Sequence, residues 1–168
     1  MNEAPPPTLP ECAPLAFLLG DWRGTGRGGY PTIDEFRFEV EMRITQWGAP
    51  YLAIEQRTWL IGSSDERIRP SHAESGYLRC LADGALELLV ATAPGQAELA
   101  TGTLHDGRIE LASRGVLSSP SASAVRETRR SYWLDGETLR FELEMAAVGQ
   151  PMTWHLAGEL RRETGRWE

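Results

Sequence analysis

Residues 35–44 alternate charged and apolar side chains without a single exception. A period of two is typical of a β-strand that is buried on one face and solvated on the other. This segment therefore predicts a half-buried strand. The side chains expected to face the core are those of Phe36, Phe38, Val40, Met42 and Ile44.

Similar patterns continue to the end of the chain, with turn signals between them. Asp-Gly or Pro-Gly pairs at 83–84, 94–95, 106–107 and 135–136 each lie in or beside an alternating run, as hairpins require. Such short connections favour antiparallel strands that are also neighbours in the sequence. The predicted strands cover residues 21–27, 35–45, 51–60, 74–81, 86–92, 97–103, 108–114, 124–133, 139–146 and 152–162.

The number of strands constrains the architecture. A single open sheet of up-and-down strands would leave exposed edges, and closure into a barrel removes them. A barrel wider than about eight strands encloses a cavity that its own side chains cannot fill. We therefore expect an all-β fold: a ten-stranded antiparallel up-and-down β-barrel of the lipocalin-like or calycin-like kind. Residues 14–20 predict a short helical turn before the barrel.

The length of 168 residues fits one domain. We expect a proline-rich N-terminal lead at residues 1–13 and one barrel domain at residues 14–168. The longest predicted connection, residues 62–73, is the best candidate for a mobile flap.

Charge and composition exclude several classes of partner. All 17 basic residues are arginines, and 24 acidic residues leave a net charge of -7, whereas nucleic acids and anionic membranes need a basic face. No signal peptide is evident, and the longest apolar stretch, residues 14–19, is too short to cross a bilayer. Cys12 and Cys80 show no spacing typical of a zinc site or a disulfide framework. We expect a soluble protein in a reducing, cytoplasmic setting.

A Gly-x-Trp-x-Gly-x-Gly motif at residues 20–26 places Gly20, Trp22, Gly24 and Gly26 on one face of the first strand. In the structural interpretation, the tryptophan plugs one end of the barrel, and the glycines let neighbouring backbone approach closely. Direct contact with a ligand is the alternative. The motif is not a phosphate loop, because the GxGxxG order is absent.

Three histidines are available for iron binding or acid–base chemistry at neutral pH. His105 precedes the Asp-Gly pair at 106–107 and is expected to be solvated. His72, in the predicted loop, is expected to lie at the surface. Strict alternation in the last strand points His155 toward solvent, unless a bulge shifts the register or the residue lies near a barrel mouth.

Other catalytic groups are not evident in the pattern. The serine-rich segment at 118–123 contains no GxSxG motif before a helix, which argues against a serine hydrolase. Glu39, Glu41, Glu142 and Glu144 lie on the polar faces of their strands, where solvation is the default. No acid–base pair is therefore predicted.

Several segments together resemble the nitrobindins, a family of small β-barrel haem proteins. The motif at 20–26 is followed by Tyr-Pro-Thr-Ile at 30–33, and the segments at 72–79 and 145–152 resemble the middle and C-terminal parts of the family. The His-Leu pair at 155–156 follows in the expected order. The resemblance covers essentially residues 14–162.

The resemblance implies that residues 14–168 form a barrel holding one haem b per chain in a shallow, solvent-open pocket. It further implies that His155 is the axial ligand of the haem iron and that Thr32 contacts the haem. The implied chemistry is the isomerisation of peroxynitrite to nitrate by ferric iron, together with binding of nitric oxide. A single axial imidazole leaves the opposite coordination site free for such ligands.

One alternative from a different functional class stays open. A barrel with the same strand pattern could instead be a lipocalin-like or fatty-acid-binding-like carrier of a small apolar ligand, without haem. In that case His155 would be a surface residue. The sequence also leaves the oligomeric state open, so an oligomer is possible.

Overall fold

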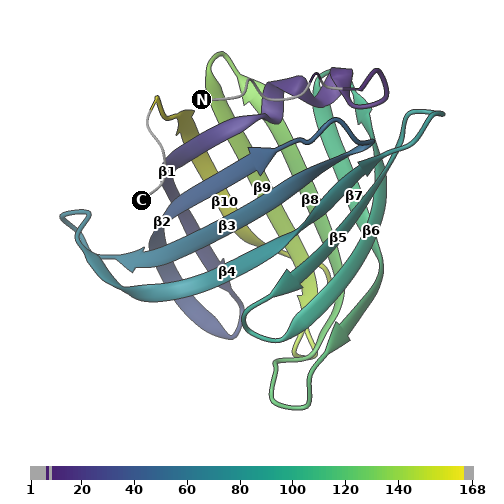
Figure 1. The fold of residues 1–168 in the computed structure, drawn as a ribbon. Coiled ribbons are helices and arrows are strands. Elements are labelled where there is room, and N and C mark those ends of the chain that lie inside the picture. Colours follow the sequence, from purple (N-terminus) through teal and green to yellow (C-terminus); the bar gives the residue numbers. More distant parts are fainter. Residues whose placement is uncertain (1–6, 8, 165–168) are drawn as a thin grey trace.

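A computed structural model describes residue 7 and residues 9–164, and in this part of the chain ten antiparallel strands form one closed barrel (Figure 1). The hydrogen-bonded order is β1-β10-β9-β8-β7-β6-β5-β4-β3-β2, so every strand pairs with its sequence neighbour and β10 closes onto β1. The predicted fold and all ten predicted strands are confirmed. The elements are η1 (Ala13–Leu18), β1 (Gly20–Tyr30), β2 (Ile33–Thr45), β3 (Tyr51–Ile61), β4 (Arg67–Cys80), β5 (Ala85–Thr92), β6 (Gln96–His105), β7 (Arg108–Ser118), β8 (Val125–Asp135), β9 (Thr138–Ala147) and β10 (Thr153–Arg162).

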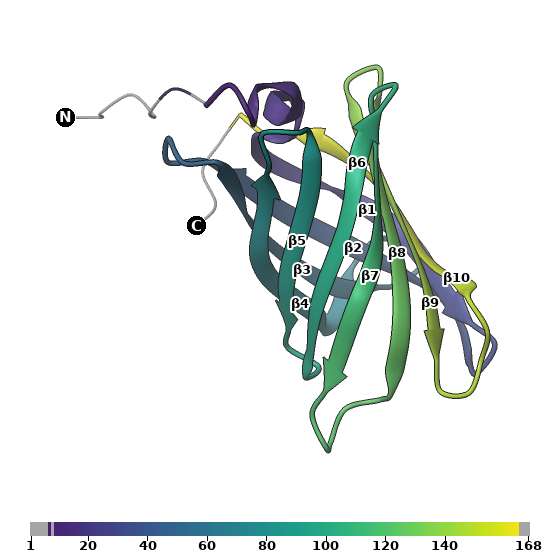
Figure 2. The same cartoon turned by 90° about the vertical axis from the view of Figure 1, so that its right-hand side faces the viewer.

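The two ends of the barrel differ. The 3-10 helix η1 lies across one end, and the hairpins that join β1 to β2, β5 to β6, β7 to β8 and β9 to β10 lie at the other (Figures 1 and 2). Leu15 and Leu18 of η1 are buried in the same apolar cluster as the inward side chains of the strands. The apolar core therefore fills the end next to η1, and we call the opposite end the open end.

The predicted alternation of β2 is observed. Phe38, Val40, Met42 and Ile44 are buried, and Phe36 is partly buried against the same core. The four predicted turns all lie at the junction of consecutive strands. These hairpins set the register that brings one face of every strand to the core.

The glycine-tryptophan motif packs at the η1 end. Trp22 is 1% exposed, and its indole Nε1 donates a hydrogen bond of 2.7 Å to the carbonyl oxygen of Leu18. A Cβ atom added at Gly24 would lie 1.9 Å from the backbone oxygen of Glu159, and one at Gly26 would lie 2.3 Å from the Phe38 ring. The glycines thus allow β1 to pack closely against β10 and the core.

The predicted flap at residues 62–73 is wrong. The turn covers only residues 62–66, and β4 begins at Arg67. The first residues of β4 are exposed on both faces, and the pairing of β3 with β4 shifts register between Arg57 and Trp59. Because neither face of this segment is buried, its sequence carries no alternation.

Cys12 and Cys80 form a disulfide, which corrects the expectation from their spacing that they are not part of a disulfide framework. Both residues are buried, with their Cα atoms 5.5 Å apart at a sequence separation of 68. The bond ties the start of η1 to the end of β4. Sequence separation could not reveal this proximity, since it depends on how η1 folds over the barrel end. The cytoplasmic location consequently stays a prediction without support from the cysteines.

The N-terminal lead predicted at residues 1–13 lies largely outside the described residues, although Cys12 and Ala13 already belong to the packed structure. Within the described chain, no helix has the length and apolar character needed to span a membrane.

The disulfide should stabilise the fold by restricting the unfolded chain. Closing a loop of this length contributes about 4 kcal/mol in the chain-entropy model. We expect the C12S/C80S variant to unfold at a lower denaturant concentration than the wild type, measured by circular dichroism in guanidinium chloride.

The matched control is the same titration with a thiol reductant, which should lower the midpoint of the wild type and leave that of the double variant unchanged. Equal midpoints for the oxidised wild type and the double variant would contradict this role.

Candidate functional site

The barrel has a hollow of about 760 Å³ on its outer wall. His155, the predicted iron ligand, lines a different cavity, which lies inside the barrel toward the open end. The inner cavity has a volume of about 660 Å³. Apolar side chains of β2, β9 and β10 and polar side chains of β3, β4, β6 and β8 line it. The lining includes Phe36, Thr58, Arg69, His72, Glu74, Glu98, Arg130, Tyr132, His155 and Leu156.

His155 faces this cavity because of a β-bulge in β10. Trp154 pairs with Glu144, whereas Leu156 pairs with Leu143, so His155 is an extra residue on its strand. Two consecutive side chains, His155 and Leu156, therefore both line the cavity. The solvent-facing position predicted by strict alternation is wrong, since the bulge shifts the register at this residue.

The orientation of the His155 ring is fixed by β1. Its Nδ1 lies 3.0 Å from the carbonyl oxygen of Gly29. A carbonyl can only accept a hydrogen bond, so Nδ1 carries the proton and Nε2 keeps its lone pair. Tyr30 and Phe36 pack edge-on against the ring, with centroid distances of 5.6 Å and 6.3 Å.

The protonation of His155 follows from its surroundings. Burial lowers the pKa of the imidazole, while the hydrogen bond to Gly29 partly opposes this effect, and the charge of His72 lowers the pKa further. The ring is therefore neutral at neutral pH. A neutral imidazole with a fixed Nδ1–H and a free Nε2 is the form that binds a transition metal.

Tyr30 anchors this arrangement at the open end. Its hydroxyl donates to the carbonyl oxygen of Met145 at 2.9 Å and accepts from the backbone N–H of Ala147 at 3.0 Å. These bonds tie the end of β1 to the end of β9. Gly29, which holds His155, is therefore next to a residue that is itself fixed in place.

The other predicted site residues are not gathered around His155. Thr32 is exposed in the turn between β1 and β2, and among the described residues the cavity wall includes its neighbour Ile33 but not Thr32. The motif of Gly20, Trp22, Gly24 and Gly26 does not line the cavity in the described chain either, because it packs toward the η1 end. His105 is exposed, as predicted.

His72 is not the surface loop residue that the sequence predicted. It belongs to β4, and its side chain lines the cavity with 30% of its surface exposed. Its Nε2 lies 3.2 Å from Oε2 of Glu74, two residues further along the same strand face.

A buried charged network, which the sequence analysis missed, lies at the same cavity. Arg130 Nη1 donates to Oε1 of Glu74 at 2.8 Å, and Nη2 donates to Oε2 of Glu98 at 2.9 Å. The Thr128 hydroxyl donates to Oε1 of Glu98 at 2.6 Å. The three charged side chains are each at most 8% exposed. The network thus joins β4, β6 and β8 across the barrel interior.

The sequence did hold a signal for this network. Glu74 stands at the same parity as buried Leu78 on β4, and Arg130 stands at the same parity as Tyr132 on β8. A charged residue at an inward position of a strand must be paired, since an isolated buried charge is very costly.

Pairing decides the ionisation of the network. Burial alone would raise the pKa of Glu74, but the charge of Arg130 and hydrogen bonds from His72 and Arg130 hold it well below its ordinary value. Burial would likewise lower the pKa of Arg130, but the carboxylates raise it. Glu74 is therefore an ionised acceptor and Arg130 a cation at neutral pH.

Comparisons with known proteins agree with this geometry. The family model "THAP4-like, heme-binding beta-barrel domain" matches residues 11–162. A peroxynitrite isomerase from Streptomyces griseus is 43% identical over 162 residues, covering 95% of this chain and 88% of the relative. One from Nocardia farcinica is 42% identical, covering 92% of each. The crystal structure of Rv2717c from M. tuberculosis gives a TM-score of 0.83 at 37% identity, over 94% of this chain and 99% of that chain.

Glu74 should stabilise the fold in a pH-dependent way. Removing one partner of a buried ion pair costs about 3 kcal/mol or more, so we expect Glu74→Gln to lower the free energy of unfolding by that order at pH 7. Because the pKa of Glu74 is lowered on folding, its contribution is complete above the ordinary value of 4.5 and is lost as the pH falls below it. Denaturant titrations at several pH values measure both effects.

Glu110→Gln is the matched control, because Glu110 is an exposed carboxylate paired with Arg108. It should change the stability at pH 7 by less than about 1 kcal/mol. A Glu74→Gln variant as stable as this control would show that the network contributes nothing.

Proposed function

Because this chain belongs to the nitrobindin family, whose THAP4-like domain is a haem-binding β-barrel, we propose that it is an enzyme that isomerises peroxynitrite to nitrate with a ferric haem. The observation that carries the proposal is the neutral His155, which a bulge turns into the cavity with Nε2 free. The peroxynitrite isomerase names of the relatives supply the reaction. The haem-binding family model favours this function over an apolar-ligand carrier.

The residues around the cavity fit a haem. His155 offers an axial nitrogen, and Phe36 and Leu156 add apolar wall to the same cavity. We propose haem b, because the sequence has no C-x-x-C-H motif for covalent attachment. Two histidines of the described chain line the cavity, and since Nε2 of His72 contacts Glu74, the single free Nε2 of His155 supports one haem per chain. Thr32 stays a proposed haem contact at the rim, supported by the position of Ile33 in the wall.

The chemistry needs little from the protein beyond positioning. When bound, a ferric haem supplies a Lewis acid that polarises the peroxide group of peroxynitrite while the O–O bond breaks and an N–O bond forms. Peroxynitrite and nitrate are monoanions of the same composition, so no side chain has to supply or remove a proton. His155 provides the axial nitrogen, and Gly29 keeps that nitrogen aimed into the cavity.

Nitric oxide is the second ligand that we propose. A single protein ligand on one side of a haem leaves the other side open to small diatomic molecules. His155 alone is proposed as such a ligand, which supports this extension of the function.

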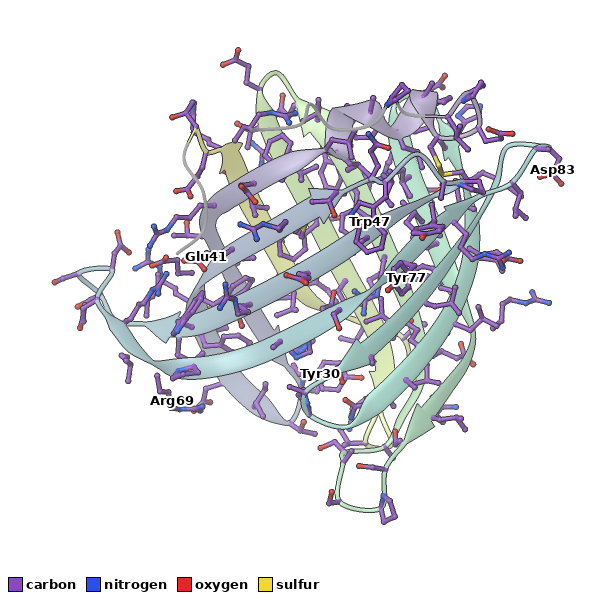
Figure 3. All side chains as sticks on the ribbon, in the orientation of Figure 1. Tyr30, Glu41, Trp47, Arg69, Tyr77 and Asp83 are labelled. Atoms are coloured by element: carbon purple, nitrogen blue, oxygen red, sulfur yellow. A yellow bond between two sulfur atoms is a disulfide. The ribbon has the colours of Figure 1, made fainter. Side chains whose placement is uncertain are left out.

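Arg69 is our candidate partner for the haem propionates. Among the described residues, Arg69 and Arg130 are the arginines that line the cavity. The guanidinium of Arg130 is already bound by Glu74 and Glu98, whereas Arg69 is exposed on β4 toward the open end (Figure 3). The hydrogen bond that Arg69 Nη1 donates to the Pro70 carbonyl leaves its other donors for an anion.

Peroxynitrite decay tests the function directly. In stopped-flow measurements, the ferric haem-loaded protein should accelerate decay and raise the yield of nitrate over nitrite. The apo protein should do neither. Decay at the same rate with and without haem-loaded protein would refute the isomerase proposal, even if haem binds.

Haem affinity tests the role of Arg69. An exposed ion pair contributes at most about 1 kcal/mol, so we expect Arg69→Ala to weaken haem binding several-fold, with a smaller loss at high salt. Arg79→Ala is the matched control, since Arg79 is an exposed arginine of the same strand that pairs with Glu87 on the outer wall. Equal haem dissociation constants for the two variants would remove Arg69 from the site.

A further inference from the structure

Large apolar side chains gather on the outer wall of the barrel. In the described chain, nine large apolar residues are well exposed, and five of them line the outer hollow of about 760 Å³. These five are Trp47, Tyr77, Leu89, Leu99 and Leu117, and we call them the outer apolar face. Soluble monomers rarely expose a contiguous apolar patch of this kind, and such patches mark interaction sites.

Strand pairing joins four of these side chains into one surface, because paired residues of neighbouring strands point to the same side of the sheet. Tyr77 pairs with Leu89, and Leu89 pairs with Leu99, which gives a row across β4, β5 and β6. In the row beside it, Ala97 pairs with Leu117 of β7. The exposed apolar side chains are therefore neighbours and not scattered over the wall.

Aromatic contacts add Trp47 to this surface. The Tyr51 ring packs edge-on against Trp47, with a centroid distance of 6.2 Å, and against Tyr77, with a centroid distance of 5.4 Å. Figure 3 shows Trp47 and Tyr77 on the same side of the barrel. Trp47 is still 60% exposed, so a large ring stays available to a partner.

Charged residues border the outer apolar face in balanced pairs. Arg43 lies opposite Glu55 across β2 and β3 at one margin. Arg79 forms an ion pair with Glu87 at the opposite margin. Each margin thus carries one arginine and one glutamate. Two copies can therefore meet at this face without opposing like charges, although each chain has a net charge of -7.

The shape of the face fits a copy of itself. Small residues, namely Ala53, Ala91, Ala97 and Gly115, line the hollow between the large side chains. Leu117 lies at the same hollow and is 78% exposed, so it projects from the wall. A two-fold interface uses the same patch on both copies, so that patch must hold both a projection and the hollow that receives it. The outer apolar face holds both.

We infer that the outer apolar face is the interface of a two-fold homodimer, in which Leu117 of each copy enters the hollow of the other. The occupant of the face is thus a second copy of this chain. The acidic chain and the glutamates at both margins disfavour an anionic membrane as the occupant. The interface lies on the outer wall and does not involve His155, so it is independent of the proposed function.

Sedimentation equilibrium of the full chain over a wide range of concentrations tests the interface. The mass of the wild type should rise with concentration toward twice the 18.7 kDa of one chain. Leu89→Glu and Leu117→Glu each bury an unpaired charge in the dimer. Each should therefore raise the dimer dissociation constant by about a hundred-fold or more.

Two further variants locate the contact. Ala91→Trp fills the hollow and should weaken the dimer without adding a charge. Ile68→Glu is the matched control, because Ile68 is an exposed apolar residue of β4 outside the face, and this variant should dimerise like the wild type. Circular dichroism spectra of all variants should match that of the wild type, which shows that they fold.

The results that would overturn the inference are distinct. A wild type that stays monomeric at every concentration would refute the homodimer and leave the face to a different partner. A dimer that persists in Leu89→Glu, Leu117→Glu and Ala91→Trp would place the interface elsewhere and refute the inference equally. A wild type that dimerises but binds no haem would refute the proposed function alone.

Discussion

One extra residue in β10 decides the direction of His155, and the site depends on it. In a regular strand, His155 would share the outer face with Ala157 and Glu159. The bulge turns its ring inward, where the Gly29 carbonyl holds Nδ1 and leaves Nε2 free. Because Tyr30 ties β1 to β9 beside this contact, the geometry is set by the hydrogen bonding of three strands rather than by a mobile loop.

The barrel divides its interior between stability and ligand binding. At one end, η1, the Trp22 ring and the Cys12–Cys80 disulfide close the barrel over an apolar core. Toward the other end the interior stays hollow and partly polar. The pairing of Glu74, Glu98 and Arg130 makes charged groups tolerable there, because each charge has hydrogen-bonded partners inside the barrel. The same pairing fixes one nitrogen of His72.

Regular features were predictable from the sequence, and irregular ones were not. Alternation and hairpin turns predicted the strands of the barrel, because burial of one face repeats at a fixed period. The bulge at His155 breaks that period, and the exposed start of β4 does not show it, so the pattern predicts a loop at His72 where the structure has a strand. The resemblance to nitrobindins predicts an inward, ligand-binding role for His155, which alternation does not. The disulfide depends on distant segments meeting, which a local pattern does not encode. For the network, strand parity marks Glu74 and Arg130 as inward charges, but it does not show that they pair with each other.

Titration of the apo protein with ferric haem tests the central claim most directly. If His155 Nε2 is the axial ligand, the wild type should develop a sharp Soret band that saturates at equimolar haem. His155→Ala should bind haem weakly, and added imidazole should restore the band of the wild type. A His155→Ala variant that saturates at the same stoichiometry with the same spectrum would show that another group holds the iron, and that the bulge in β10 does not build the site.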